Sequence, residues 1–125
     1  MNARQTLLFA SGSGFLVVAL GAFGAHGLAE VLGERVHTWE TAVQYQMFHT
    51  LALLALGLML QAGQAQAVWL QRAAVAFAAG ILIFSGSLYL LALSGIRWLG
   101  MITPLGGVAF LLGWLALARG TCFPK

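Results

Sequence analysis

The first long apolar run of the sequence ends in the stretch Gly21-Ala22-Phe23-Gly24-Ala25-His26-Gly27-Leu28, where closely spaced glycines precede a histidine. The run begins at Gln5 and contains no Asp, Glu, Lys or Arg. At about 1.5 Å per residue it is long enough to cross a hydrocarbon layer of about 30 Å. We therefore expect a membrane-spanning helix over 5–27. A signal peptide is the competing interpretation, but its apolar core is usually only about 7 to 15 residues long.

Composition points to an integral membrane protein. Of the 125 residues, 61% are hydrophobic and 7% are charged, which leaves too little polar surface for a soluble domain. The six Lys and Arg residues are spread along the chain and form no basic patch, so we expect no nucleic-acid partner. Cys122 is the single cysteine, which excludes a disulfide or a multi-thiolate metal site within one chain. No cofactor or metal is expected.

Three further apolar runs complete a single membrane domain. They predict spans over approximately 40–61, 67–93 and 98–118, and a longest external loop over 28–39. In the second run, Leu51–Leu60 alone would cover only about 15 Å. More polar residues upstream must therefore enter the membrane, and His49 is expected near its middle. The fold class is all-α, a four-transmembrane-helix bundle.

The sequence leaves two local structures undecided. Apolar residues in the loop recur at a spacing that suits a short interfacial helix, although an ordinary solvated loop is as consistent with the pattern; they are Leu28, Val31, Leu32 and Val36. In the last span, either Thr103 caps a helix with Pro104 in its first turn, or Pro104 kinks a continuous helix.

Basic residues predict the orientation. Four spans place both termini on one side, and four Lys and Arg residues lie on that side: Arg4, Arg72, Arg119 and Lys125. The other side has only Arg35 and Arg97. Because cytoplasmic loops carry an excess of Lys and Arg, we predict that both termini are cytoplasmic. All four tryptophans are expected near span ends as interfacial anchors: Trp39, Trp69, Trp98 and Trp114.

The first half of the second span is polar, which is costly in hydrocarbon unless the polar groups face inward and find partners. Ser85, Ser87 and Tyr89 in the third span, and Thr103 in the fourth, are available as partners. We therefore predict an intramembrane polar cluster, made of Glu40, Gln44, Tyr45, Gln46, His49, Thr50, Ser85 and Tyr89.

Glycine makes up an unusual share of the spans, and small residues four apart, such as Gly21 and Ala25, allow helices to approach closely. We expect rim and helix-packing roles for Gly21, Gly24, His26, Thr103, Pro104, Gly106 and Gly107.

Several functions are compatible with a polar cluster around His49. It is either an interhelical hydrogen-bond network, a proton or ion relay, a site for a polar head group, or a haem ligand. Haem is the least favoured, because His26 is expected to be about 10 Å shallower than His49. No nucleophile elbow supports a hydrolase. We predict a protein that is not an enzyme.

Four blocks of sequence together resemble a known family: Gly21–His26, Tyr45–Thr50, Phe84–Tyr89 and Thr103–Gly107. The chain is identified as a member of the domain-of-unknown-function family 423, the YgdD-like proteins of bacteria, which are similar to transmembrane protein 256 of animals. The resemblance covers nearly the whole chain. It implies four transmembrane helices in a bacterial inner membrane, and no established activity, cofactor or catalytic residue.

We therefore predict a multi-pass inner-membrane protein with a binding function, either as an accessory subunit of a larger membrane complex or as a lipid-binding bundle. Membrane lipids, a larger complex or further copies of the chain are the expected partners. The alternative is a small oligomeric transporter or ion- or proton-coupled channel that uses the cluster around His49. An enzyme acting on a lipid-soluble substrate ranks third.

Overall fold

Helices make up nearly all of the chain in a computed structural model, which describes residues 1–63 and 66–122. Lys125, one of the residues on which the predicted orientation depends, lies outside this part of the chain. The helices, in order, are α1 (Ala3–His26), α2 (Ala29–Leu32), the short 3₁₀ helix η1 (Gly33–Arg35), α3 (Val36–Gln61), α4 (Ala67–Gly80), the π-helical turn η2 (Ile81–Ser85), α5 (Gly86–Ser94), the 3₁₀ helix η3 (Arg97–Met101) and α6 (Thr103–Cys122).

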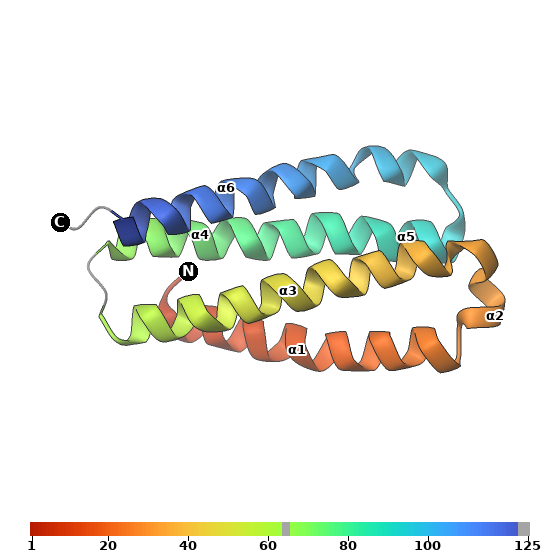
Figure 1. The fold of residues 1–125 in the computed structure, drawn as a ribbon, viewed down its shortest axis with the longest axis horizontal. Coiled ribbons are helices and arrows are strands. Elements are labelled where there is room, and N and C mark those ends of the chain that lie inside the picture. The colour runs from red at the N-terminus through yellow and green to blue at the C-terminus, as the bar shows by residue number, and fades with distance from the viewer. Residues whose placement is uncertain (64–65, 123–125) are drawn as a thin grey trace.

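Four helical segments are long and apolar enough to cross a membrane: Ala3–His26, Ala29–Gln61, Ala67–Ser94 and Arg97–Thr121. The third consists of α4, η2 and α5 in sequence. The prediction of an all-α protein with four spans is confirmed. The start of α1 and the end of α6 lie at the end of the bundle opposite α2 (Figure 1).

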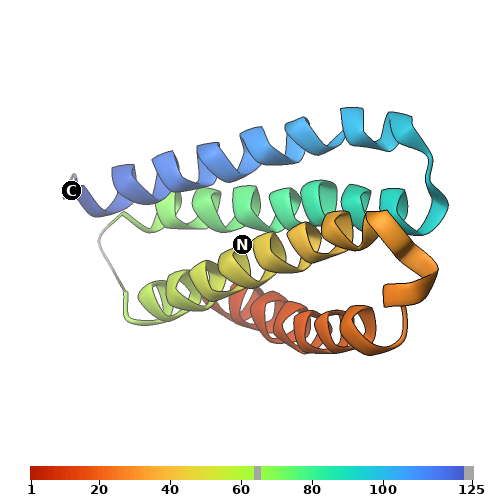
Figure 2. The same ribbon diagram turned by 45° about the vertical axis from the view of Figure 1, so that its right-hand side comes forward.

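The four spans pack in chain order. α1 packs chiefly on α3, α3 packs on α4, η2 and α5, and α6 packs on α4 and η2 (Figures 1 and 2). The second and third spans are therefore central, and the first and fourth lie on either side. The main core lies where α3, α4 and α6 meet, and it includes Leu53, Leu56, Leu70, Phe77 and Phe110.

Glycines set the distance between α4–α5 and α6. The ring of Phe77 lies against Gly113, and the ring of Phe110 lies in turn against Gly80, so each helix receives an aromatic ring from the other. Gly106 lies directly on the backbone of Phe84. A side chain on any of these glycines would push the two spans apart, as expected for small residues at a transmembrane helix interface.

The stretch 28–39, expected as the longest loop, contains α2, η1 and the first turn of α3. Leu32 is buried and packs with Trp39 and Ala92 in a second, smaller core. The apolar spacing therefore produces a short helix that closes this end of the bundle, while Val31 remains exposed. The second span gains its first turns from the same stretch, because α3 begins at Val36.

At the start of the fourth span, Pro104 lies in the first turn of a helix, as in the first of the two expected arrangements, but the expected cap by Thr103 is not formed. η3 ends at Met101, and α6 begins at Thr103 with Pro104 in its first turn, where the missing N–H of proline costs no helical hydrogen bond. Thr103 is the first residue of α6 and so lies one position beyond the N-cap. Its hydroxyl lies 2.6 Å from that of Ser87 and 3.5 Å from the carbonyl oxygen of Leu99.

Candidate functional site

A buried hydrogen-bond network joins the first three spans, and we call its members Ser13, Gln46, Thr50 and Tyr89 the Gln46 network. The Nε2–H of Gln46 donates to the Ser13 hydroxyl at 3.1 Å and approaches the Ser13 carbonyl oxygen at 3.4 Å. Gln46 Oε1 accepts from the Tyr89 hydroxyl at 2.6 Å. The hydroxyls of Ser13 and Thr50 are 2.7 Å apart. One amide therefore links α1, α3 and α5.

Other buried polar groups also bond to neighbouring helices. The Ser85 hydroxyl donates to the carbonyl oxygen of Ala42 at 2.7 Å, and the indole N–H of Trp39 donates to that of Leu20 at 2.9 Å. Within residues 1–63 and 66–122, no buried side-chain nitrogen or oxygen is without a hydrogen-bond partner. The interior of the bundle is thus satisfied by the protein itself, and the polar contacts hold helices together.

His49 lies outside this network and bonds to α6. Its Nδ1 is 2.8 Å from the carbonyl oxygen of Tyr45, and its Nε2 is 3.1 Å from Nε1 of Trp114. An indole nitrogen can only donate, so Nε2 is the acceptor and the proton lies on Nδ1, where it bonds the carbonyl. The imidazole is therefore in its neutral form, and neither nitrogen has a lone pair free for a metal or haem.

Aromatic rings fix the position of this imidazole. It stacks on Phe110 with the ring centroids 3.6 Å apart and the planes 8° apart. The rings of Phe77 and Phe48 lie 5.3 and 5.2 Å away. His49 is only 3% exposed. It is therefore a packed part of the interface between the second and fourth spans.

A groove of about 800 Å³ opens between α3 and α6, and we call it the α3–α6 groove. Phe84, from η2, is the one lining residue that the third span contributes. The other lining residues come from α3 and α6: Gln44, Tyr45, Met47, Phe48, His49, Leu51, Pro104, Gly107, Val108, Phe110, Leu111 and Trp114. Phe48, Leu51 and Leu111 are 58%, 62% and 65% exposed, so the sides of the groove open outward from the bundle.

The structure divides the predicted polar cluster. Gln46, Thr50 and Tyr89 lie together in the Gln46 network. Ser85 bonds separately, and His49 lies at the α3–α6 groove with Tyr45. The ring of Tyr45 is tilted over Phe84, with 4.5 Å between centroids.

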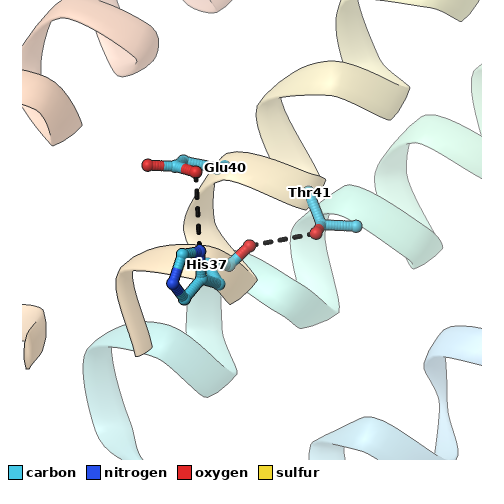
Figure 3. Close-up of polar contacts among 3 residues, drawn as sticks. All are labelled: His37, Glu40 and Thr41. Atoms are coloured by element: carbon cyan, nitrogen blue, oxygen red, sulfur yellow. Dashed lines mark hydrogen bonds and ion pairs between the residues drawn. The ribbon is translucent and has the colours of Figure 1, made fainter. Parts of the chain in front are cut away.

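Glu40 and Gln44 depart from the prediction of an inward-facing cluster. Glu40 is exposed and lies 3.8 Å from Nδ1 of His37, which is also exposed; Figure 3 shows this pair beside the bond from the Thr41 hydroxyl to the His37 carbonyl oxygen. Because α3 begins at Val36, Glu40 is in its second turn, near the end of the bundle, and need not turn inward. Gln44 is exposed and lines the α3–α6 groove.

The predicted rim and packing residues have different roles. Gly24 lies directly under the indole of Trp39, whereas Gly21 has ordinary contact with Val43. Pro104 and Gly107 line the α3–α6 groove. Gly106 packs on Phe84, Thr103 bonds Ser87, and His26 is exposed at the end of α1.

Two of the predicted interfacial tryptophans have internal roles. Trp39 is 3% exposed and bonds within the bundle, and Trp114 bonds His49. Because both indole N–H groups have hydrogen-bond partners inside the bundle, these side chains do not need the polar groups of the membrane interface. Trp98 is 60% exposed, and Trp69 is partly buried beside Arg72 and Arg119.

Sequence reasoning missed Ser13, Phe77 and Phe110, and it assigned Trp114 to the membrane interface instead of to His49. One signal was available for part of this set: Gly106, Gly113 and Gly120 are seven residues apart and so lie on one face of α6. Phe84, Phe77 and Leu70 have the same spacing and pack against them in antiparallel order. Ser13 had no comparable signal, because a serine in an apolar helix does not reveal which neighbour it faces.

No group of three or more His, Cys, Asp or Glu side chains among the described residues could hold a metal ion. His26 lies at the end of α1 and His49 near the middle of α3, so the two imidazoles that a bis-histidine haem would need are on different levels.

Comparison with known proteins identifies the family. Residues 20–107 match the family described as "Protein of unknown function (DUF423)". The chain is 46% identical over 121 residues to the "UPF0382 inner membrane protein YgdD" of Escherichia coli K12, an alignment that covers 96% of this chain and 91% of the relative. It is 46% identical to the "UPF0382 membrane protein" of Haemophilus influenzae, over 87% of this chain and 86% of the relative. It is 47% identical to a "UPF0382 membrane protein" of Staphylococcus saprophyticus, over 85% of this chain and 87% of the relative.

No solved structure matches the chain. The relatives are named as membrane proteins, in Escherichia coli of the inner membrane, and the four spans of this structure agree with that location. The chain is thus a multi-pass inner-membrane protein that belongs to the DUF423 family, a family of unknown function.

Proposed function

We propose that this protein is a non-enzymatic binding protein of the inner membrane, which holds an acyl chain of a membrane lipid in the α3–α6 groove. The observation that carries the proposal is the groove itself. Its walls are aromatic and aliphatic, and its exposed residues face outward from the spans, where the hydrocarbon of the membrane lies.

The dimensions of the groove suit one lipid chain. Along α6 its lining runs from Pro104 to Trp114, a rise of about 15 Å. That length is about half of a hydrocarbon core of about 30 Å, which corresponds to one leaflet. His49 stacks on Phe110, and Phe84 lies tilted against Phe110 with the ring centroids 5.4 Å apart, so ring contacts within the protein already order the inner wall before a ligand arrives.

The polar groups at the groove favour binding over catalysis. Among the described residues that line it, none is a serine, cysteine, lysine or carboxylate. Its histidine uses both ring nitrogens in bonds to Tyr45 and Trp114. A general base needs a free lone pair within reach of a substrate proton, and this imidazole offers none.

Retention of a neutral lipid tests the proposal. Gly107 lines the groove, and the nearest atom to an added Cβ is 4.0 Å away on Phe84, so Gly107→Phe fills the groove without displacing backbone. Gly86→Phe is the matched control, because Gly86 also has open space around it and does not line the groove.

The measurement is native mass spectrometry of the chain purified in mild detergent with added phosphatidylethanolamine. We expect the wild type and Gly86→Phe to retain the lipid and Gly107→Phe to lose most of it. Equal retention by all three proteins, or a wild-type chain without lipid, contradicts the proposal.

The transporter alternative receives less support. The Gln46 network is closed by bonds between protein groups, and His49 bonds two partners, so these polar groups, among the residues that the structure describes, do not form a series of exchangeable sites. Contact with further copies of the chain or with a larger membrane complex remains part of the proposal, and the same mass measurement reports it directly.

A further inference from the structure

Two arginines from different spans converge on one indole. The guanidinium carbon of Arg72, in α4, is 4.8 Å from the ring centroid of Trp69, and that of Arg119, in α6, is 5.4 Å from it. Both distances are within the range of cation–π contact. The start of α4 and the end of α6 lie side by side at one end of the bundle (Figure 1), so the two cations are held at that end.

The close packing of α6 on α4 supports this arrangement. A side chain at Gly120 would meet Leu70 and the Cβ of Trp69, at 2.9 and 3.3 Å from its own Cβ. The absence of one lets the end of α6 lie against Trp69, which brings Arg119 to the indole that Arg72 already contacts. The juxtaposition thus follows from the helix packing.

An apolar groove leads away from the two arginines. It has a volume of about 330 Å³ and is lined by Trp69, Arg72, Ala76, Leu112, Leu115, Ala116 and Arg119. Leu112 precedes Arg119 by two helical turns, so the groove extends about 10 Å along α6 toward the middle of the span. One end of the groove is cationic and the rest is aliphatic, which matches a lipid with an anionic head group and an acyl chain.

Acidic side chains are confined to one end of the bundle, which also carries Arg35 and Arg97. The acidic side chains of the protein are Glu30, Glu34 and Glu40, and they belong to α2, η1 and the start of α3, at the end opposite Arg72 and Arg119. Arg4 lies at the same end as Arg72 and Arg119, in the first turn of α1. This end of the protein therefore presents a positive field to the membrane surface.

We propose that Arg72 and Arg119 bind the phosphate of an anionic phospholipid whose acyl chain enters the groove between α4 and α6. A guanidinium presents paired N–H donors that match phosphate oxygens, and two such groups can hold one phosphate from two sides. Trp69 holds both arginines at the level where indoles lie in a membrane interface. This site is separate from the α3–α6 groove.

The test compares two lipids with identical acyl chains, phosphatidylglycerol and phosphatidylcholine, titrated onto the full chain in mild detergent and followed by native mass spectrometry. We expect the wild type to prefer phosphatidylglycerol. Arg72→Gln and Arg119→Gln are each expected to reduce that preference about fivefold. Arg4→Gln removes the same charge at the same end without lining the groove, and is expected to reduce the preference much less than either of the other two variants.

The preference ratio separates binding from folding, because partial unfolding would weaken both lipids alike. Gly107→Phe fills only the α3–α6 groove and is expected to keep the preference ratio. The two lipid sites are therefore tested separately, and failure of the α3–α6 groove proposal would not affect this one. Equal binding of the two lipids by the wild type overturns the proposal, as does an equal effect of Arg4→Gln. Glycerol phosphate carries the phosphate group without an acyl chain. If it bound as tightly as phosphatidylglycerol, the proposed role of the acyl chain would be wrong.

Discussion

The indole N–H of Trp114 donates to Nε2 of His49 over 3.1 Å, and this bond joins the second span to the fourth across the inner wall of the α3–α6 groove. The two residues are 65 positions apart in the sequence. The bond determines the tautomer of the histidine, because Nε2 accepts from the indole and Nδ1 bonds the Tyr45 carbonyl oxygen. His49, which the sequence offered as a candidate for a proton or ion relay, accepts a hydrogen bond between two helices in this structure.

Trp114→Phe is expected to destabilise the protein by about 1 kcal/mol, because the substitution keeps an aromatic ring but leaves Nε2 of His49 without its donor. Unfolding of the purified protein in detergent, followed by circular dichroism, measures the change. Trp98→Phe is the control, since Trp98 is 60% exposed. A loss of stability no larger for Trp114→Phe than for Trp98→Phe would show that the bond contributes nothing.

Gly106→Ala is expected to cost about 1 to 3 kcal/mol, because the added methyl group would meet the backbone of Phe84, which cannot move away as a side chain could. Gly86→Ala gives the matched comparison. It adds the same atom where the nearest neighbour is beyond 4 Å, so the gain in helix propensity of up to about 1 kcal/mol should appear as stabilisation. The same unfolding measurement reports both variants, and effects of the same sign would refute the packing argument.

The bond between Tyr89 and Gln46 is expected to show coupling of about 1 kcal/mol in a double-mutant cycle with Tyr89→Phe and Gln46→Leu. Each single variant leaves a buried polar group unpaired, whereas the double variant removes both, so its cost should be less than the sum. A second cycle that pairs Tyr89→Phe with Ser94→Ala should be additive, since Ser94 is exposed and bonds within its own helix. Additivity in the first cycle as well would mean that the 2.6 Å contact is without energetic effect.

The sequence predicted the spans and part of the polar interior. Apolar runs separated by charges suffice to locate membrane helices, because every backbone group in hydrocarbon must be bonded within the helix. Gln46, Thr50 and Tyr89 were assigned to one cluster because polar side chains in a span turn inward. The rule failed for Glu40, since its place near the end of the bundle depends on α3 beginning at Val36.

The sequence alone could not predict the α3–α6 groove or the bond between His49 and Trp114. Both depend on α6 lying beside α3 over η2, and that arrangement follows from long-range packing of Phe84, Phe77 and Phe110 against glycines. Helical periodicity says which face of a helix is apolar, but not which neighbour it meets. The heptad spacing of Gly106, Gly113 and Gly120 marks the packing face of α6, and only the matching spacing of Leu70, Phe77 and Phe84 points to the third span as its partner.

The orientation of the protein in the membrane depends on few charges. Reporters fused after Lys125 are expected to behave as cytoplasmic, and a reporter inserted at Gly33, in the exposed turn after α2, as periplasmic. Arg4→Gln with Arg72→Gln would leave two basic residues on each side, so we expect a mixed population of orientations. Arg35→Gln with Arg97→Gln removes the same number of charges from the other side and should leave the orientation unchanged. A periplasmic C-terminal reporter in the wild type would invert the topology and would place the Arg72 and Arg119 site in the outer leaflet.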